Sequence, residues 1–347
     1  VGRSLKGAFD RRLDSGFRDP GSLVGRCVEA HALNDIQLFD ELYEPIRNKG
    51  QPEYNKTPVL FDIELALFDA MLFGNTDQGV LAARALAGWV RHLEPSVDRW
   101  RAGPAGDATG RWGSWHALGS YSLFGWHEIG LAYDFGYEFL NDRERADVRR
   151  VISKLTRGAY SFGMNLPPHL RTWNWINCGN YFGLLVLAIE GEEGYDERVY
   201  ARAVEVMADY LHHNYSSAGS STEPVGYTSF GYVWGAEALL AMARRGENLL
   251  VSTPYLAVPN GQVQCLAPYG GAFYSFGDGG SHAPTFDELH LRKAAFPRDP
   301  TVDFLFQQVA GELIDDPDQY LDRRGRPFLA AALATDPDGT DHQFGAD

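Results

Sequence analysis

Apolar residues recur at three- and four-residue intervals along most of the chain, a spacing typical of α-helices with one buried face. The segment 58–73 is apolar on most sides, so we expect it to be buried over most of its circumference. The same pattern predicts one or two helices over 115–140 and single helices over 23–46, 58–73, 79–93, 143–162, 174–190, 196–213, 228–245, 286–295 and 301–314.

Helix-ending and helix-capping residues mark several of these boundaries. Residues 74–77 (Gly-Asn-Thr-Asp) end one helix and supply the N-cap of the next, which we expect Pro95 to stop. Asn141 and Asp142 cap the following helix, and Glu144 in its first turn complements the helix dipole.

Long helices joined by short polar loops predict a mainly α fold, because antiparallel neighbours need only short connections. Strand signals are scarce, and only 263–266 and 272–276 resemble short strands or extended loop. We interpret the chain as an incomplete (α/α) toroid of antiparallel helix hairpins, with an unrelated α-superhelix as the alternative. The expected organisation is an N-terminal arm over 1–20, a toroidal catalytic domain over 21–330 and a flexible tail over 331–347.

The formal net charge of −15 argues against nucleic acid or an anionic membrane as the partner. An acidic substrate remains compatible, because a few Arg and Lys side chains can form a local positive cleft. No apolar run is long enough to predict a membrane span. Aromatic residues make up 13% of the chain, which suits a groove that binds sugar rings.

The three cysteines, Cys27, Cys178 and Cys265, have no zinc-like spacing and no even count, so we expect them to be free and buried. No metal or other cofactor is expected. The chain starts at Val1 without an apolar signal core, which predicts either a cytoplasmic protein or a signal already removed; a secreted or periplasmic location is favoured.

Aromatic, amide and charged side chains suited to binding or catalysis gather in two clusters that flank a pair of predicted helices. Sugars are bound by aromatic faces together with amide and carboxylate groups. The competing interpretation is that the tryptophans are core residues and that Asn174 is a helix N-cap. The first cluster contains Arg171, Trp173, Asn174, Trp175 and Asn177, and the second contains Glu223, Tyr227 and Tyr232.

Several short motifs resemble one protein family. They are Ile129–Phe135 followed by Leu140–Arg145, the Trp-Asn-Trp-Ile-Asn-Cys-Gly segment at 173–179, Glu-Pro-Val-Gly-Tyr at 223–227 and Phe-Gly-Asp at 276–278. Together they resemble the helical domain of the heparinase II/III-like polysaccharide lyases, over roughly residues 115–310.

The resemblance implies an incomplete (α/α) toroid, usually followed by an antiparallel β-sandwich, and β-elimination at uronic-acid glycosidic bonds. The chain departs from the family pattern in two respects. No sandwich is visible in the sequence, although in the relatives it normally supplies a catalytic histidine. The amide segment carries Asn where many members carry His.

β-Elimination removes a proton next to a carboxylate and expels the oxygen at C4, so it needs a carboxylate neutraliser, a base and an acid. By resemblance, Tyr227 is the base and acid; a phenol with a pKa of about 10 then needs cations or strong donors nearby. Asn174 and Asn177 are the candidate neutralisers, because residues three apart share a helix face. Glu223 would orient the tyrosine or bind a hydroxyl, and His282 is the candidate for the missing histidine. A packed turn aromatic is the alternative for Tyr227.

The remaining candidates would bind an acidic polysaccharide or oligosaccharide. Arg171 can hold a substrate carboxylate in a bidentate pair. The other candidates are the stacking residues Trp112, Trp115, Trp173, Trp175 and Tyr232 and the histidines His116 and His127.

Two other functions remain open at the level of sequence. A glycoside hydrolase on a similar helical toroid needs two opposed carboxylates, for which Asp134 with Glu223, or Asp278 with Glu223, are the candidate pairs. The other alternative is a non-catalytic or truncated glycan-binding helical domain.

Overall fold

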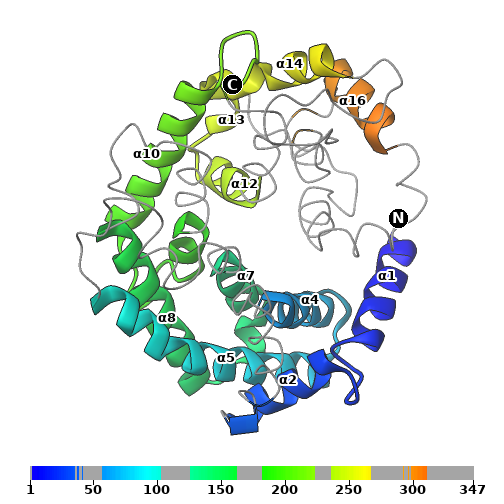
Figure 1. Ribbon diagram of the computed structural model, residues 1–347, viewed down its shortest axis with the longest axis vertical. Helices are drawn as coiled ribbons and strands as arrows, with labels where there is room; N and C mark the ends of the chain where they lie inside the picture. The colour runs from blue at the N-terminus through cyan, green and yellow to red at the C-terminus, as the bar shows by residue number, and fades with distance from the viewer. Residues whose placement is uncertain are drawn as a thin grey trace. The chain divides into compact units, whose positions relative to one another are not determined.

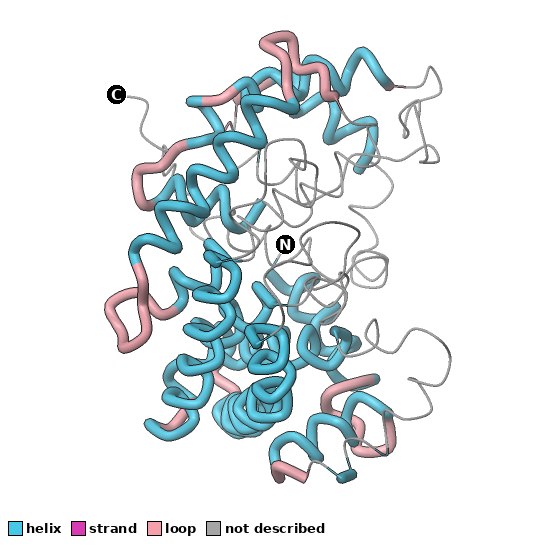
Figure 2. Tube along the Cα trace, turned by 60° about the vertical axis from the view of Figure 1, so that its left-hand side comes forward, coloured by secondary structure: helices cyan, strands magenta, loops and turns pink. Residues whose placement is uncertain are grey.

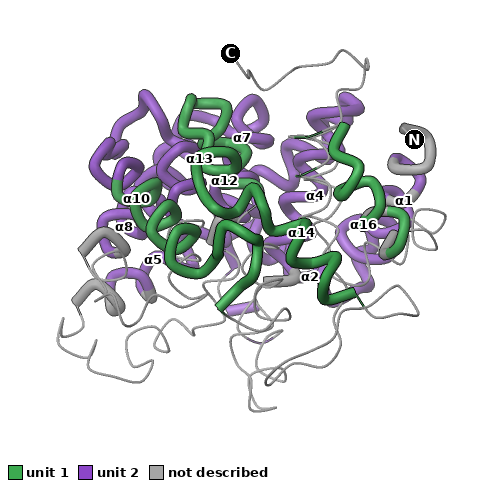
Figure 3. The backbone as a smooth tube through the Cα atoms, turned by 90° about the horizontal axis from the view of Figure 1, so that it is seen from above, with its two compact units in different colours: residues 1–5, 167–180, 202–347 green, residues 6–166, 181–201 purple. Residues whose placement is uncertain are grey.

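The computed structural model describes residues 2–35, 37–38, 41, 57–102, 126–161, 182–222, 236–266, 292, 296 and 298–310. The chain divides into two compact units, coloured separately in Figure 3. Unit 1 comprises Val1–Leu5, Pro167–Asn180 and Arg202–Asp347, and unit 2 comprises Lys6–Leu166 and Tyr181–Ala201.

Over the described ranges the regular elements are helices, and the rest of the backbone forms turns, loops and isolated bridges (Figure 2). The predicted mainly α class is therefore confirmed. Six α-helices that lie largely in unit 2 are labelled in Figure 1: α1 (Gly2–Ser15), α2 (Leu23–Ala32), α4 (Thr57–Phe73), α5 (Thr76–Ala102), α7 (Trp126–Gly136) and α8 (Asp142–Ser161). Unit 2 also contains η3 (Tyr137–Phe139) and the helical residues 182–188. The elements of unit 1 are most of α10 (Glu197–Asn214), α12 (Ala236–Arg244), α13 (Leu249–Ser252), η6 (Pro254–Ala257), α14 (Val258–Cys265) and α16 (Pro300–Ala310).

Helix α4 lies at the centre of unit 2. Every residue of 59–70 is buried, and the helix packs against α2, α5 and α7. A helix that is apolar on most sides gains free energy when neighbours cover most of its circumference, which is the arrangement predicted for 58–73. Exposure returns at Met71, just before Gly74 adopts a left-handed φ of 75° and the helix ends.

Two predicted caps are confirmed. The backbone N–H of Glu144 donates to Asn141 Oδ1 and the N–H of Asn141 donates to Glu144 Oε2, both at 3.0 Å, which forms a reciprocal capping box for α8. At the start of α5, Asn75 Oδ1 accepts from the N–H of Gln78 at 3.3 Å.

The predicted stop at Pro95 is wrong, because α5 continues to Ala102. Proline removes one helical hydrogen bond, but ion pairs to α8 hold the helix on both sides of it. Arg91 pairs with Asp147 at 3.0 Å before the proline, and Asp98 pairs with Lys154 at 2.8 Å after it. The tertiary contacts of α5 therefore outweigh the local break.

Two further predictions are corrected. The helix predicted over 23–46 is interrupted after Ala32, and residues 37–38 and 41 are helical again. At the interruption Asn34 takes a φ of 57° and the N–H of Asp35 donates to the Ala30 carbonyl at 2.8 Å, a Schellman ending. In the segment 263–266, predicted to be a short strand or extended loop, residues 263–265 instead form the last turn of α14. Pro259 lies in the first turn of α14, where a missing N–H costs no helical hydrogen bond.

Other helix predictions are confirmed where the chain is described, at α7, α8, α10, α12, α16 and 182–188. The predicted strand at 272–276 and the tail at 331–347 lie outside the described residues. The segment 1–20, predicted to be an arm, contains α1, in which Phe9 and Leu13 are fully buried.

Cys27 is free and buried, and Cys265 is free and half-buried, while Cys178 lies outside the described residues. No helix in the described ranges is both long enough and apolar enough to cross a membrane.

Candidate functional site

The predicted site residues fall almost entirely outside the described residues. His127 is the second residue of α7, and only its backbone is described. The others outside the described ranges are Arg171, Trp173, Asn174, Trp175, Asn177, Glu223, Tyr227, Tyr232, His282, Trp115, Trp112, His116 and Asp278. Their convergence on one groove stays a prediction, and the described elements α7, 182–188 and α10 are near them in the chain.

Helix α7, which carries part of the family-like motif, is held closely by its neighbours. It packs against α4, α5 and α8. A Cβ at Gly130 would lie 3.3 Å from the Leu184 carbonyl oxygen, so glycine permits close approach of the helical turn 182–188. Phe182 and Leu185 in that turn are fully buried. The chain leaving the predicted amide cluster thus enters a helix packed directly on α7.

Tyr133 of α7 is fully buried and forms a hydrogen-bonded group with Glu192 and Arg149. Its hydroxyl donates to both Glu192 carboxylate oxygens, at 2.9 and 3.0 Å, and Arg149 Nη1 donates to Glu192 Oε2 at 2.6 Å. Burial, followed by the neighbouring Glu192 carboxylate, raises the pKa of Tyr133, so the phenol keeps its proton. Tyr133 therefore fixes the turn at 189–194 to α7 and does not face solvent.

Asp134, the next residue in the motif, has a different environment. Its side chain reaches solvent and makes no hydrogen bond or ion pair with any described residue. Surrounding protein nevertheless displaces enough water to raise the pKa of its carboxyl group. Asp134 and the half-buried Leu131 thus form the solvent-facing stripe of α7, whose other residues from 128 to 136 are buried.

The second predicted cluster begins immediately after a fixed turn. Tyr215 and Ser221 form an antiparallel bridge, and the Thr222 N–H donates to the Asn214 carbonyl at 2.9 Å. The Thr222 hydroxyl also donates to Asn214 Oδ1 at 2.7 Å, while Asn214 Nδ2 donates to the Tyr210 carbonyl. The chain is therefore anchored to the end of α10 at the residue that precedes Glu223.

The sequence pattern does not identify Glu192 as a partner of the motif tyrosine. The only local signal is the acidic, glycine-containing turn Glu190–Gly194, which also suits a solvated loop. The acceptor role of Glu192 depends on a contact between distant parts of the chain, and the periodicity of apolar residues does not predict such contacts.

Over the part of the chain that the structure describes, no group of three or more His, Cys, Asp and Glu side chains is arranged to hold a metal ion. Comparison of the chain with protein-family models, with curated proteins and with solved structures finds no match in any of the three.

Proposed function

We propose that this protein is a polysaccharide lyase that cleaves a uronic-acid-containing glycan by β-elimination, on an incomplete (α/α) toroid of the heparinase II/III-like kind. The observation that carries the proposal is the order of two clusters in the sequence: amides at Asn174 and Asn177, then Glu223 and Tyr227 after two intervening helical segments. The mainly helical fold and the anchored chain position at Thr222 support it.

In the proposed reaction an Asn amide donates to the uronate carboxylate and stabilises the charge that develops as the neighbouring C–H bond breaks. The Tyr227 phenolate accepts the C5 proton, the bond from C4 to the glycosidic oxygen breaks, and a C4–C5 double bond forms. The resulting Tyr227 phenol then donates its proton to the leaving oxygen, which restores the phenolate and balances the reaction. Arg171 would pair with a substrate carboxylate.

The test incubates purified protein with alginate, glucuronan, heparan sulfate and chondroitin sulfate and follows the ultraviolet absorbance of unsaturated uronate. Wild-type protein should raise the absorbance with at least one glycan. Tyr227→Phe should lose this activity while keeping its helical circular dichroism. Tyr137→Phe is the matched control, because Tyr137 lies on η3 with 36% of its surface exposed, and it should stay active. Folded wild-type protein that is inactive on all four glycans would contradict the proposal.

A glycoside hydrolase is the second candidate, favoured by one observation. The Asp134 carboxyl group has a raised pKa and no partner among the described residues, which suits a general acid. Release of reducing ends without an unsaturated product, abolished by Asp134→Asn, would support the hydrolase over the lyase. Glycan binding without turnover, unchanged in Tyr227→Phe, would instead indicate a binding domain.

A further inference from the structure

A buried arginine and three tyrosines in unit 1 form a continuous packed group, here called the tyrosine stack: Arg292, Tyr255, Tyr215 and Tyr210. The guanidinium carbon of Arg292 lies 3.9 Å from the Tyr255 ring centroid, and Arg292 Nη2 donates to the Tyr255 carbonyl at 2.9 Å. The Tyr255 and Tyr215 rings meet edge to face at 5.9 Å, and the Tyr215 and Tyr210 rings at 6.3 Å. The stack therefore joins Arg292 to the end of α10.

Arg292 has no exposed surface. A buried guanidinium is held in place by the groups that stabilise its positive charge and accept hydrogen bonds from its N–H groups. The Tyr255 ring face and the Tyr255 carbonyl are two such groups on one residue, so Arg292 fixes both the side chain and the backbone of Tyr255. Tyr255 is further held through its N–H, which donates to the Thr253 hydroxyl at 3.3 Å.

The turn at 215–221 lies against the backbone of η6 and α14. A Cβ at Gly219 would overlap the carbonyl oxygen of Ala257, and a Cβ at Gly261 would overlap the carbonyl oxygen of Gly219. Gly219 also has a left-handed φ of 84°, which disfavours any larger residue. Contact between backbones leaves this turn little freedom to shift unless Tyr255 and η6 shift with it.

Two candidate catalytic segments adjoin this group in the chain. Thr222, at the end of the fixed turn, directly precedes Glu223 and the Tyr227 segment, and Arg292 follows the His282 segment. Arg292 thus contacts Tyr255, which supports the turn before the Glu223 and Tyr227 segment. Arg292 itself lies in the part of the chain that follows the His282 segment.

We propose that Arg292, acting through Tyr255 and Tyr215, is a positioning residue for the segment that carries Glu223 and Tyr227. The inference rests on the proposed lyase function for its catalytic consequence. A displacement of about 1 Å at a reacting group can lower a rate by about a hundredfold. Loss of the stack should therefore reduce kcat more than it changes KM, because substrate contacts at the first cluster are untouched.

The first experiment compares Arg292→Met with Arg12→Met in the full chain, at a temperature where circular dichroism shows both to be folded. Arg12 is the matched control: it pairs with the buried Asp62 at 3.0 Å and lies over Phe61, within unit 2. Arg292→Met should lower kcat on the cleaved glycan at least tenfold and change KM less than threefold. Arg12→Met should lower the melting temperature but keep kcat within threefold of wild type.

A second pair of variants tests the positioning role even if Arg292→Met does not fold. Tyr215→Phe keeps the ring contact with Tyr255 and should retain kcat within threefold, whereas Tyr215→Leu removes that contact and should lose at least fivefold. Equal kcat values for Tyr215→Phe and Tyr215→Leu, or for Arg292→Met and Arg12→Met, would overturn the positioning role.

Hydrogen exchange followed by mass spectrometry separates this inference from the lyase proposal. Arg292→Met should speed amide exchange in residues 215–222, while Arg12→Met should leave it unchanged. If wild-type protein cleaves no glycan, the lyase proposal fails, and exchange alone decides whether Arg292 fixes the turn. Unchanged exchange at 215–222 in Arg292→Met would overturn the inference whether or not the protein is a lyase.

Discussion

At the scale of single residues, Asp69 is a fully buried carboxylate held by several donors. Lys6 Nζ lies 2.7 Å from Oδ1, and Arg18 Nη2 and Gln78 Nε2 lie 3.1 and 3.0 Å from Oδ2. Asp69→Asn should reduce the free energy of unfolding by about 2 kcal/mol, because a fully buried carboxylate loses its charge-assisted hydrogen bonds with Lys6 and Arg18. Urea denaturation measures the change.

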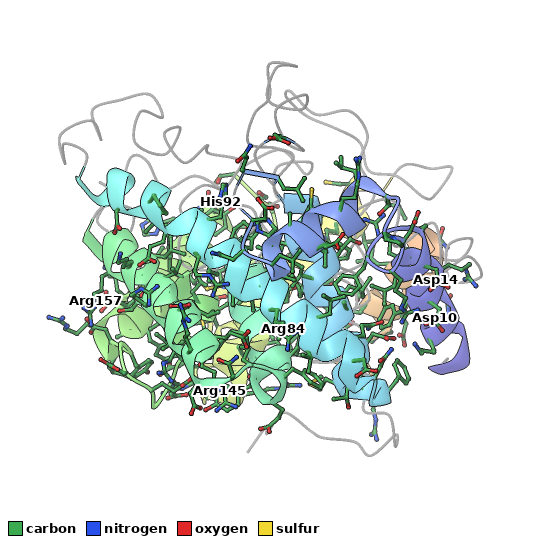
Figure 4. The ribbon with its side chains drawn as sticks, turned by 90° about the horizontal axis from the view of Figure 1, so that it is seen from below. Asp10, Asp14, Arg84, His92, Arg145 and Arg157 are labelled. Carbon is green, nitrogen blue, oxygen red and sulfur yellow. The ribbon has the colours of Figure 1, made fainter. Side chains whose placement is uncertain are left out.

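Asp14→Asn provides the matched control. Asp14 pairs with the same arginine at 2.9 Å, but 65% of its side chain is exposed, and both Asp10 and Asp14 lie along α1 in Figure 4. Solvent screens this pair, so the expected loss is below about 1 kcal/mol. Similar losses for Asp69→Asn and Asp14→Asn would show that burial does not set the strength of this network.

At the scale of elements, the crossing of α2 and α5 depends on Gly88. A Cβ there would overlap the carbonyl oxygen of His31. Alanine usually stabilises a helix interior by about 1 kcal/mol relative to glycine, but Gly88→Ala should destabilise by about 2 kcal/mol or more, because the two backbones must separate. Gly7→Ala in α1 should instead stabilise, since its Cβ would meet only the end of the Arg11 side chain at 3.4 Å. Melting temperatures that move in the same direction would contradict this account.

The ion pairs between α5 and α8 should make stability depend on pH. Hydrogen bonding from Arg150, aided by Lys154, lowers the pKa of Glu94 from 4.5 to about 2. The folded state thus binds this proton less readily than the unfolded chain. The stabilisation is present above pH 4.5 and is lost as pH falls toward 2. Allowing for solvent screening, the loss should be about 1 kcal/mol.

Urea denaturation at pH 5 and pH 3 tests this prediction. Glu94→Gln should show a smaller decrease in stability between the two pH values than wild type, while Glu138→Gln, an exposed residue of η3, should decrease as wild type does. A Glu94→Gln variant with the full wild-type decrease would exclude Glu94 as its source.

At the scale of the whole molecule, the predictable features are those encoded locally. The burial of α4 follows from its composition, and the Asn141–Glu144 box follows from two residues three apart. The continuation of α5 past Pro95 depends on Asp147 and Lys154, more than fifty residues away, so sequence pattern could not show it. Glu192 and Arg292 were missed for the same reason, since their roles come from distant contacts. Of the candidate site residues, the structure describes Asp134 and the backbone of His127.

The net charge of −15 leads to a prediction for the proposed activity as a whole. A polyuronate is also negative, so long-range repulsion should slow its encounter with the protein at low salt. Raising NaCl from 0.01 to 0.15 M shortens the screening length from about 30 Å to about 8 Å, which should increase kcat/KM about threefold. The assay is initial ultraviolet absorbance rate at several substrate concentrations. Because repulsion acts on encounter, kcat at saturating glycan should change little. A fall in kcat/KM with salt would mean that a local cationic site, such as one around Arg171, outweighs the charge of the whole molecule.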